Sequence, residues 1–478
     1  MEVRDLEPKQ VWNNFANLND VPRPSKKEER VIAFAKSFGE NLGLETYVDS
    51  VGNVIVKKPA SSGMENRKTV ILQSHLDMVH QKNADTVFDF ETQGIQMLIE
   101  DGWVTANGTT LGADNGMGVA AIMSLLESTE IAHPALEALF TIDEETGMTG
   151  AFGLEKGILE GDILLNLDTE DDDEFSIGCA GGIDTNTNYE YETEPATGQA
   201  YKITVKGLKG GHSGMDIHLG RGNANKIMNR LITGCENHNL RIAEIDGGSL
   251  RNAIPRESFG IITAQESYLA DFESRSIDIK NEHAIVESGL VINIEEVDLP
   301  QNVVCAADAE KITNSVRAMH NGVYAMSMTI DGLVETSSSL SRVIVKDGKF
   351  ITQSLQRSSV DTAKMDVAYT IGAVFKLMGC DVEHTGSYPG WSPNPKSEIL
   401  DLMVDKYKFI FNEDPRVQSC HAGLECGILG EKLPGVDMIS FGPTIRNPHS
   451  PDEKVKIDTV DKFWHFLVEV LKDTPVKS

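Results

Sequence analysis

The first third of the chain alternates short apolar runs with stretches that have helical spacing. Apolar positions three and four residues apart recur across Val31–Leu42 and Gly116–Glu127, which predicts two helices. Four runs rich in apolar and β-branched residues predict strands at Asn53–Lys57, Thr69–Gln73, Leu136–Ile142 and Asp162–Leu167. Because strands that alternate with helices form a mainly parallel sheet with helices on both faces, we predict an α/β domain.

The pattern changes near Gly181, where the expected strands become richer in threonine and tyrosine. Helices are expected near Asn223–Thr233 and from about Asp361 to Met378. The expected strands of this region are Tyr201–Val205, Ser258–Thr263, Tyr324–Ile330 and Ser341–Lys346. Proline and glycine then gather between Tyr388 and Pro395, which indicates a domain boundary.

After this boundary the α/β pattern returns, with helices expected at Glu398–Phe411 and Val460–Leu471 and a strand at Asp437–Phe441. We therefore predict a discontinuous α/β domain, about residues 1–182 and 391–478, in which a mainly parallel sheet is flanked by helices. An α+β lid domain, about residues 183–390, is inserted into it. The length of 478 residues agrees with two domains, because one hydrophobic core rarely organises so long a chain.

Composition and net charge argue against some classes of function. With 40% hydrophobic and 24% charged residues the chain is typical of a globular protein. A formal net charge of -30 repels phosphate backbones and anionic lipids, so we expect no nucleic-acid partner and no membrane partner. The N-terminal residues lack a basic segment followed by an apolar core, and the six cysteines show no C-x-x-C spacing. We expect a cytoplasmic protein with reduced thiols.

Acidic residues and a histidine follow the ends of three expected strands. His75 and Asp77 lie two residues apart, so on an extended chain their side chains project to the same side. Three consecutive carboxylates, Asp143–Glu145, end the next strand, and Asp168 ends another. Adjacent carboxylates repel one another, and a divalent cation reverses that penalty. Because ligands gather at the carboxyl ends of strands in open α/β sheets, we expect these side chains to share a site.

Two loops add further candidates. Asp114 precedes a helix in a Gly-rich segment, and His449 lies in a proline-rich loop. Alone, Asp114 is interpreted most simply as a helix N-cap and His449 as a loop residue. Together with the strand-end residues they form a set of His, Asp and Glu without thiolate, which suits zinc, manganese or cobalt. Two ions that share one carboxylate suit hydrolysis, with Glu144 and Glu145 divided between a base and a ligand.

The inserted domain contributes three candidates. His212 lies in the segment Gly210–Gly214, where glycines allow close backbone approach. Asn252 and Arg357 lie further along the lid. Each has a structural alternative, since a loop histidine is usually a surface residue, an asparagine often forms a turn, and an arginine is commonly an exposed charge.

Six segments resemble the family of co-catalytic zinc peptidases that includes aminoacylases, carnosinases and aminoacyl-histidine dipeptidases, the last group most closely. The resemblance spans nearly the whole chain. It is carried by Gly63–Lys68, His75–Val79, Gly108–Gly116, Gly207–Gly214, His421–Gly427 and Pro448–Glu453.

The resemblance implies two divalent metal ions per chain, with zinc as the first choice and manganese or cobalt as alternatives. Asp114 would bridge the two ions. The remaining ligands would be His75 and Asp168 on one ion, and Glu145 and His449 on the other.

The resemblance also implies roles for the other candidates. Asp77 would orient the first histidine ligand, consistent with the spacing between them. Glu144 would be the general base for a water held between the ions. His212 and Asn252 would reach the scissile carbonyl oxygen from the lid, and Arg357 would bind the substrate carboxylate.

The implied activity is hydrolysis of dipeptides, including Xaa-His substrates such as β-alanyl-histidine (carnosine), by a monomer or homodimer. Two alternatives stay open. An N-acyl-amino-acid amidohydrolase or a broader dipeptidase of the same family would use the same chemistry. A non-catalytic metal- or peptide-binding relative would be expected to lack the base or a ligand, yet Glu144 and all five ligand positions are present.

Overall fold

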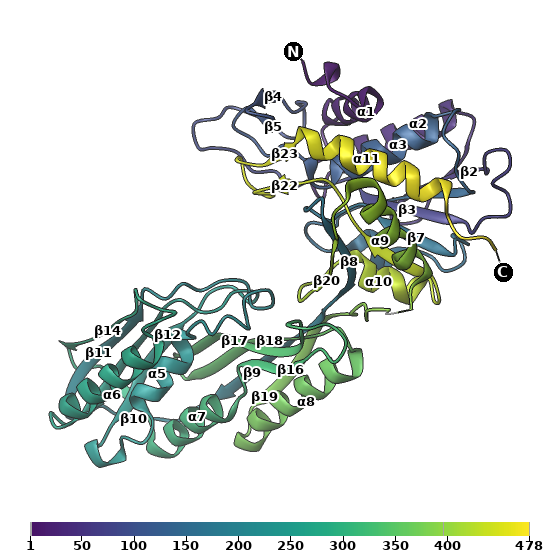
Figure 1. Cartoon of the computed structure of the whole chain (residues 1–478). Coiled ribbons are helices and arrows are strands. Elements are labelled where there is room, and N and C mark those ends of the chain that lie inside the picture. Colours follow the sequence, from purple (N-terminus) through teal and green to yellow (C-terminus); the bar gives the residue numbers. More distant parts are fainter. Residues whose placement is uncertain (1, 395, 478) are drawn as a thin grey trace. The chain divides into compact units, whose positions relative to one another are not determined.

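A computed structural model of the chain describes residues 2–394 and 396–477. By its internal contacts the chain divides into two compact units, which we describe separately (Figure 1). The first unit comprises residues 1–178, 393–419 and 424–478, and the second, called the lid unit below, comprises residues 179–392 and 420–423. These limits differ by a few residues from the boundaries expected at 182/183 and 390/391. Residues 420–423, expected in the first domain, lie in the lid unit.

An eight-stranded sheet forms the centre of the first unit, in the order β1-β2-β6-β3-β7-β21-β8-β20. β3 pairs in parallel with β6 and β7, and β7 pairs in parallel with β21. The ladders of β1 with β2, β2 with β6 and β8 with β21 are antiparallel, so the parallel pairing is central. The strands are β1 (Glu45–Val48), β2 (Val54–Lys58), β3 (Val70–His75), β6 (Leu136–Thr141), β7 (Ile163–Asn166), β8 (Glu174–Cys179), β20 (Arg416–Cys420) and β21 (Asp437–Ser440). A smaller sheet contains β4 (Met97–Glu100), β5 (Trp103–Ala106), β22 (Ile445–Arg446) and β23 (Lys454–Lys456).

Helices cover both faces of the large sheet. Contacts with Val56, Ser74 and Phe441, which share one face of the sheet, place α2, α3 and α11 there together with α9. α10 contacts Gln73 on the opposite face, and α4 lies beside α10. The helices of this unit are α1 (Lys9–Asn19), α2 (Glu29–Asn41), α3 (Ala113–Glu127), α4 (Thr149–Gly153), α9 (Glu398–Phe411), α10 (Glu425–Lys432) and α11 (Ile457–Lys472), with a 3-10 turn at Val3–Asp5. Every residue of α3 from Asn115 to Leu126 is buried, which explains why its sequence is apolar nearly all round.

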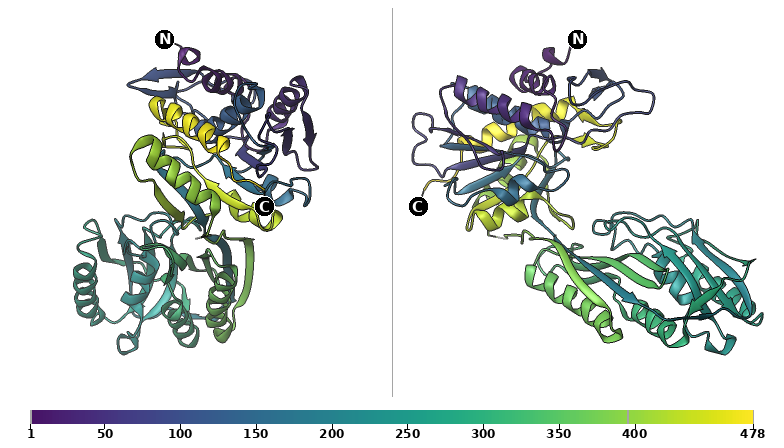
Figure 2. Two further views of the ribbon diagram at one scale, coloured as in Figure 1. Left: turned by 45° about the vertical axis from the view of Figure 1, so that its right-hand side comes forward. Right: turned by 180° about the vertical axis from the view of Figure 1, so that it is seen from behind.

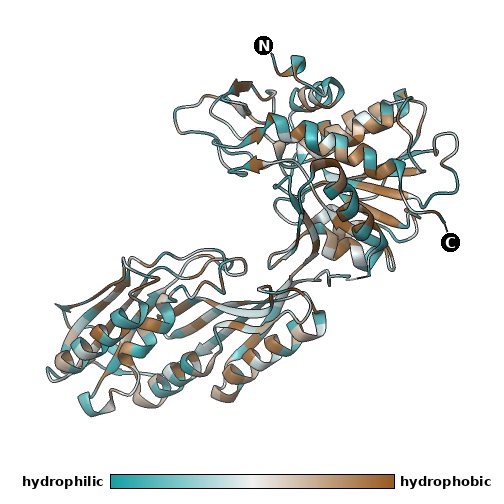
Figure 3. Cartoon of the chain, in the orientation of Figure 1, coloured by the Kyte–Doolittle hydropathy of each residue, from teal (hydrophilic) through white to brown (hydrophobic). Residues whose placement is uncertain are grey.

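The central strands are buried on both faces, which explains their continuous apolar runs (Figure 3). One of the buried polar groups lies near the end of β3. There Gln73 donates from Nε2 to Oε2 of Glu425 at 2.7 Å and to Oγ1 of Thr141 at 3.1 Å. Because buried polar groups need hydrogen-bond partners, this network allows β3 to end in a polar segment that leads to His75.

The lid unit is a nine-stranded sheet with helices on one face, as Figures 1 and 2 show. Its order is β14-β11-β13-β12-β17-β18-β9-β19, with β16 paired to β17, and the described ladders are antiparallel. The strands are β9 (Gly181–Glu190), β11 (Gln199–Lys206), β12 (Arg241–Gly247), β13 (Ser258–Ala264), β14 (Val291–Val297), β16 (Gly322–Met326), β17 (Val334–Lys346), β18 (Lys349–Ser358) and β19 (Asp381–Tyr388). A separate pair is β10 (Thr193–Pro195) with β15 (Asn302–Val304). The helices are α5 (Ala224–Ile232), α6 (Tyr268–His283), α7 (Ala306–Ala318) and α8 (Asp361–Met378), with a 3-10 turn at Glu236–His238.

The predicted fold class is confirmed: an α/β unit with a central parallel region carries an inserted α+β unit. The helix predicted from about Asp361 to Met378 is α8. The strand predicted at Tyr324–Ile330 is wrong in its second half, because β16 ends at Met326 and Oγ of Ser327 accepts from the backbone N–H groups of Thr329 and Ile330. Within residues 2–394 and 396–477, none of the helices is long and apolar enough to cross a membrane.

Candidate active site

Asp114 is the centre of a histidine and carboxylate cluster in the first unit. Its Oδ1 lies 3.1 Å from Nε2 of His75, and its Oδ2 lies 3.2 Å from Nε2 of His449. His75 is the last residue of β3, whereas His449 lies in the loop after β22. One carboxylate therefore faces two imidazoles that are far apart in the sequence.

Two further carboxylates complete the cluster. Oδ1 of Asp168 lies 3.6 Å from Nε2 of His75, and Oε2 of Glu145 lies 2.9 Å from Nε2 of His449. Asp168 follows β7 and Glu145 follows β6, so the parallel strands deliver these groups to one edge of the sheet, as expected. The structure thus brings together all five of the predicted metal ligands.

The electrostatics of the cluster reflect its burial and its crowding with carboxylates. Burial raises the pKa of Asp168 well above its usual range, and the carboxylate of Asp114 adds to this effect. Against the effect of burial, hydrogen bonds from His449 and His75 hold the pKa of Asp114 well below its usual range. Hydrogen bonds to Asp114 and Glu145 raise the pKa of His449 to about 11. Such a concentration of perturbed groups is typical of functional sites.

The cluster fits divalent cations. Potential ligand atoms of His75, Asp114 and Glu145 all lie within 4.8 Å of one another. Oε1 of Glu145 and Oδ1 of Asp168 are buried without a hydrogen-bond partner among the described residues. Buried carboxylate oxygens without donors are costly, and a cation would satisfy them. Imidazole and carboxylate ligands without thiolate suit zinc, manganese or cobalt.

Asp77 supports the cluster from behind His75 and is fully buried. Its Oδ1 lies 3.5 Å from Nδ1 of His75, and its carboxylate also accepts from the backbone N–H groups of Glu144 at 3.0 Å and Glu145 at 3.4 Å. Asp77 therefore contacts His75, as expected, and also holds the backbone of the segment that follows β6.

A second carboxylate group, formed by Glu28, Asp77 and Asp143, also lies close enough together to hold an ion. Its members already have polar partners. Asp143 accepts from Nζ of Lys26 at 2.5 Å and from the hydroxyl groups of Thr146 and Thr149. We therefore interpret this group as a support for the loop that carries Glu144 and Glu145.

In the lid unit, His212 and Arg357 lie side by side. Nη2 of Arg357 is 3.4 Å from Nε2 of His212. Nδ1 of His212 accepts from the backbone N–H groups of Gly214 and Met215, which leaves the hydrogen of a neutral imidazole on Nε2. Burial and then the charge of Arg357 lower the pKa of His212 to about 4, so its ring is neutral near neutral pH. Two donor groups, Nε2–H of His212 and Nη2 of Arg357, therefore lie close together.

Arg357 is held by its own unit while keeping part of its guanidinium free. It is 4% exposed, and its Nη1 donates to Oη of Tyr388 at 2.8 Å. Its Nε is buried without a hydrogen-bond partner among the described residues. An anionic ligand would satisfy this donor. The structural alternative for Arg357, an exposed charge, is therefore wrong.

Asn252 lies next to His212 through its backbone. Its carbonyl oxygen accepts from the N–H of Ser213 at 2.8 Å, and His212 forms an isolated bridge with Ala253. The side chain of Asn252 is exposed. The structure therefore brings His212, Asn252 and Arg357 together within the lid unit.

Residues 71–473 of the chain match Peptidase family M20/M25/M40. The chain belongs to this family. This M20 peptidase is 42% identical to the cytosol non-specific dipeptidase of Escherichia coli (strain K12) over 484 residues, which covers all of both chains. It is also similar to the crystal structure of aminoacylhistidine dipeptidase from Vibrio alginolyticus, with a TM-score of 0.95, 44% identity, and coverage of 100% of this chain and 99% of that chain. Aminopeptidase PepT from Bacillus cereus ATCC 10987 shares the fold, with a TM-score of 0.58 and 16% identity over 98% of this chain and 99% of that chain.

Peptidases of this family depend on metal ions, and the cluster around Asp114 provides candidate ligands. Several buried charged residues of this M20 peptidase were not singled out by the sequence. Arg23, Glu425 and Glu453 are at most 2% exposed and lie in the first unit. In the lid unit, His421 is buried and its Nε2 lies 2.7 Å from Oγ of Ser337. Glu425, Glu453 and His421 fall inside segments that carry the family resemblance, which was the available signal for them.

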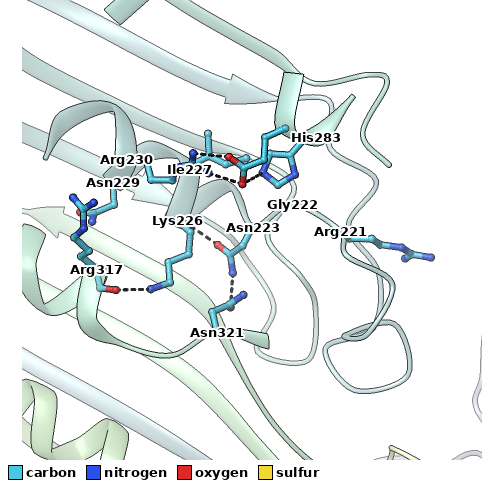
Figure 4. Close-up of a pocket in the computed structure, with 11 residues that line it drawn as sticks. Arg221, Gly222, Asn223, Lys226, Ile227, Asn229, Arg230, His283, Arg317 and Asn321 are labelled. Atoms are coloured by element: carbon cyan, nitrogen blue, oxygen red, sulfur yellow. Dashed lines mark hydrogen bonds and ion pairs between the residues drawn. The ribbon is translucent and has the colours of Figure 1, made fainter. Parts of the chain in front are cut away.

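The lid unit also contains a cavity of about 390 Å³ (Figure 4). Two of its cationic side chains already have partners within the unit. Nζ of Lys226 donates to the carbonyl oxygens of Val316 and Met319, and Arg230 forms a two-pronged ion pair with Glu282. We therefore do not interpret this cavity as an anion-binding or catalytic site of the M20 peptidase.

Proposed function

We propose that the chain is a metal-dependent dipeptidase that hydrolyses Xaa-His dipeptides, including β-alanyl-histidine. One observation carries the proposal: the two carboxylate oxygens of Asp114 each face a different imidazole, and each imidazole has a second carboxylate beside it. This is the arrangement expected of two neighbouring cation sites that share one ligand. The names of two relatives that match over their whole length, a non-specific dipeptidase and an aminoacylhistidine dipeptidase, support the substrate class.

We propose two ions per chain, with zinc as the first choice. His75 and Asp168 would hold one ion, Glu145 and His449 the other, and Asp114 would contact both. Bound there, divalent cations would polarise a peptide carbonyl and promote the ionisation of water. Asp77 keeps the ring of His75 oriented and holds the backbone of Glu145, so both halves of the site depend on it.

Glu144 is the proposed general base. It directly precedes the ligand Glu145, and its backbone N–H is fixed by Asp77 at 3.0 Å. Burial, followed by the charges of Glu425, Glu145 and Asp114, raises the pKa of Glu144 well above its usual range, against the effect of His75. A carboxylate in such surroundings accepts a proton more readily than one in water.

The lid residues are proposed to bind the substrate. The Nε2–H group of neutral His212 is a suitable donor to the oxygen that becomes negatively charged in the transition state. Arg357 has an unpartnered Nε and is proposed to bind the terminal carboxylate of the dipeptide. Asn252 is proposed to assist at the carbonyl oxygen. We further propose a cytosolic location, in line with the name of the Escherichia coli relative, and a monomer or homodimer.

A dipeptide panel combined with metal analysis tests this function. Metal-free protein should be inactive and should regain turnover of β-alanyl-histidine when two equivalents of zinc, manganese or cobalt are added. The panel should include other dipeptides and N-acetyl amino acids. Turnover of N-acetyl amino acids in preference to every dipeptide would contradict the proposed substrate class, and wild-type turnover without metal would contradict the proposed chemistry.

Replacing His212 by alanine is expected to lower kcat by ~10²–10³, because the donor to the developing oxyanion is lost. Metal content should stay at the wild-type value, since His212 is not a proposed ligand. Loss of a uniform binding contact would instead raise KM with little change in kcat. Steady-state kinetics on β-alanyl-histidine separate the two results.

The exposed His218 provides a matched control for this experiment, because it lies in the same loop region. His218→Ala should keep wild-type kinetics. Normal kcat in His212→Ala at saturating dipeptide would remove His212 from the catalytic residues.

A further inference from the structure

Two buried charged residues that are not proposed ligands connect the three segments that carry His75, Asp114 and His449. They are Arg23, which precedes α2, and Glu453, which precedes β23. Arg23 is 1% exposed and Glu453 is 2% exposed, and both lie in the first unit. Burial of a charge is costly unless the group is paired or well hydrogen-bonded, so the contacts of each residue indicate what its burial achieves.

Glu453 binds the backbone that leads into Asp114. Its Oε2 accepts from the N–H groups of Leu111 at 2.8 Å and Gly112 at 2.9 Å. Its Oε1 accepts from the N–H groups of Ala113 at 2.7 Å and Asp114 at 3.2 Å. One carboxylate thus accepts from four successive N–H groups.

Glu453 is also close in the sequence to His449. It lies four residues after His449, in the same short loop. Leu111 and Gly112 come just before α3, and Ala113 and Asp114 are its first two residues, where N–H donors have no acceptor within the helix. Glu453 therefore ties the loop that carries one histidine of the cluster to the segment that carries the central carboxylate.

Arg23 makes the corresponding connection to the other histidine. Its Nη1 donates to the carbonyl oxygens of Leu76 and Asp77, both at 3.1 Å, directly after His75. Its Nη2 donates to the carbonyl oxygen of Gly112 at 2.6 Å. Gly112 is therefore held on both sides, through its N–H by Glu453 and through its carbonyl oxygen by Arg23.

The packing around this connection is tight. Gly112 has a φ of 71°, and a Cβ atom there would lie 2.5 Å from Nη2 of Arg23. A Cβ atom at Gly116 would lie 2.7 Å from the same nitrogen. Glycine at these two positions therefore permits the guanidinium to approach the backbone, and Gly112 also permits the left-handed conformation.

The backbone that is held in this way decides where the side chain of Asp114 points. Asp114 lies in α3 by hydrogen bonding but has φ -80° and ψ 112°, which is not helical. The direction of a side chain follows from its backbone conformation, and Oδ1 and Oδ2 of Asp114 face different histidines. A change in this backbone would turn one oxygen away from its imidazole.

We propose that Glu453 and Arg23 are positioning residues that fix Asp114 between His75 and His449 and so allow one chain to hold two cations at adjoining sites. The inference rests on the proposed dinuclear site but makes no assumption about the substrate. A purely structural role is the competing explanation, since a carboxylate that binds four N–H groups also stabilises the fold. The two explanations differ in what they predict for metal affinity.

Glu137 provides a matched control for Glu453. It is 5% exposed, lies in β6 of the same unit, and its Oε2 accepts from the backbone N–H groups of Glu160 and Gly161, both at 2.9 Å. It lies near the start of β6, whereas the candidate ligands follow the end of that strand. Glu137→Gln therefore removes a buried backbone-binding carboxylate that is not connected to Asp114.

The test compares Glu453→Gln, Glu137→Gln and wild type as full-length, metal-free proteins titrated with Co²⁺. The amide introduced by Glu453→Gln would present hydrogens to some of the four donors, so the backbone before Asp114 would lose acceptors. Affinity for cobalt should fall ~10–100-fold, the usual effect of losing a group that orients metal ligands, and the visible absorption spectrum of the bound cobalt should change. Glu137→Gln should lower the unfolding temperature and keep the wild-type affinity and spectrum.

Wild-type cobalt affinity and spectrum in Glu453→Gln, with a loss of stability like that of Glu137→Gln, would overturn the proposal and leave Glu453 a structural role. Should Glu453→Gln fail to fold, Arg23→Lys serves as the second variant, because lysine keeps the charge but cannot span Leu76, Asp77 and Gly112 with one planar group. It should also weaken cobalt binding and alter the spectrum, and unchanged values would again overturn the proposal. Cobalt affinity and the cobalt absorption spectrum do not depend on hydrolysis. Failure of this proposal can therefore be distinguished from failure of the proposed dipeptidase function.

Discussion

Glu144→Gln is expected to lower kcat for dipeptide hydrolysis by ~10²–10⁴ while both metal ions stay bound. The amide has nearly the size of the carboxylate but cannot accept a proton from the attacking water. Glu144 is not one of the five proposed ligands. Its backbone N–H is held by Asp77, which does not depend on the side chain of residue 144, so the variant should keep the local structure. Metal analysis and steady-state kinetics on the same sample measure both parts of the prediction.

The neighbouring carboxylate provides the matched comparison. Glu145 lies 2.9 Å from His449 and is a proposed ligand, so Glu145→Gln should lose an ion as well as activity. The pair of variants therefore separates the base from the ligand, although the two residues are adjacent in the chain. Near-normal turnover in Glu144→Gln would contradict its assignment as the base.

The metal-ligand cluster could be predicted from the sequence because parallel strands bring their carboxyl ends together. β3, β6 and β7 are wholly buried, so each is marked by a mainly apolar run, and the polar residue after each run was visible without a structure. The pairing of His75 with Thr141 in the register of β3 and β6 then places the two strand ends side by side.

The supporting residues could not be predicted in the same way. Glu453 binds backbone N–H groups, and these contacts have no side-chain pattern in the sequence that would identify the partner segment. Arg23 similarly donates to backbone carbonyl oxygens. Such contacts depend on how distant loops meet. The local pattern of apolar and polar residues does not predict this.

Some secondary structure was also not predicted correctly from the sequence. The end of β16 was predicted too late because the sequence after Met326 remains apolar in part, whereas the side chain of Ser327 forms a local turn that competes with the strand. Helix α6 was missed, although Tyr268, Phe272, Ser276 and Ile279 are buried at helical spacing. Charged and polar residues fill most of the remaining positions of α6, which weakens the apolar pattern.

Asp114→Ala is expected to abolish metal binding and activity together. Among the described residues of the cluster, Asp114 is the one whose two oxygens face both His75 and His449. Its removal would leave each proposed ion with one ligand fewer and would also remove the negative charge that screens the two cations from each other. Elemental analysis after dialysis should therefore find little metal, and turnover of β-alanyl-histidine should fall to background.

Asp452 provides the control for this variant, because it is an exposed carboxylate in the loop that carries His449. Asp452→Ala should bind two ions and hydrolyse the dipeptide at the wild-type rate. The comparison matters because loss of one acidic residue also changes the net charge, and the control reproduces that change without touching the cluster. If Asp114→Ala retained two ions per chain, Asp114 would not be the shared ligand, and the two histidines it faces would have to hold their ions independently.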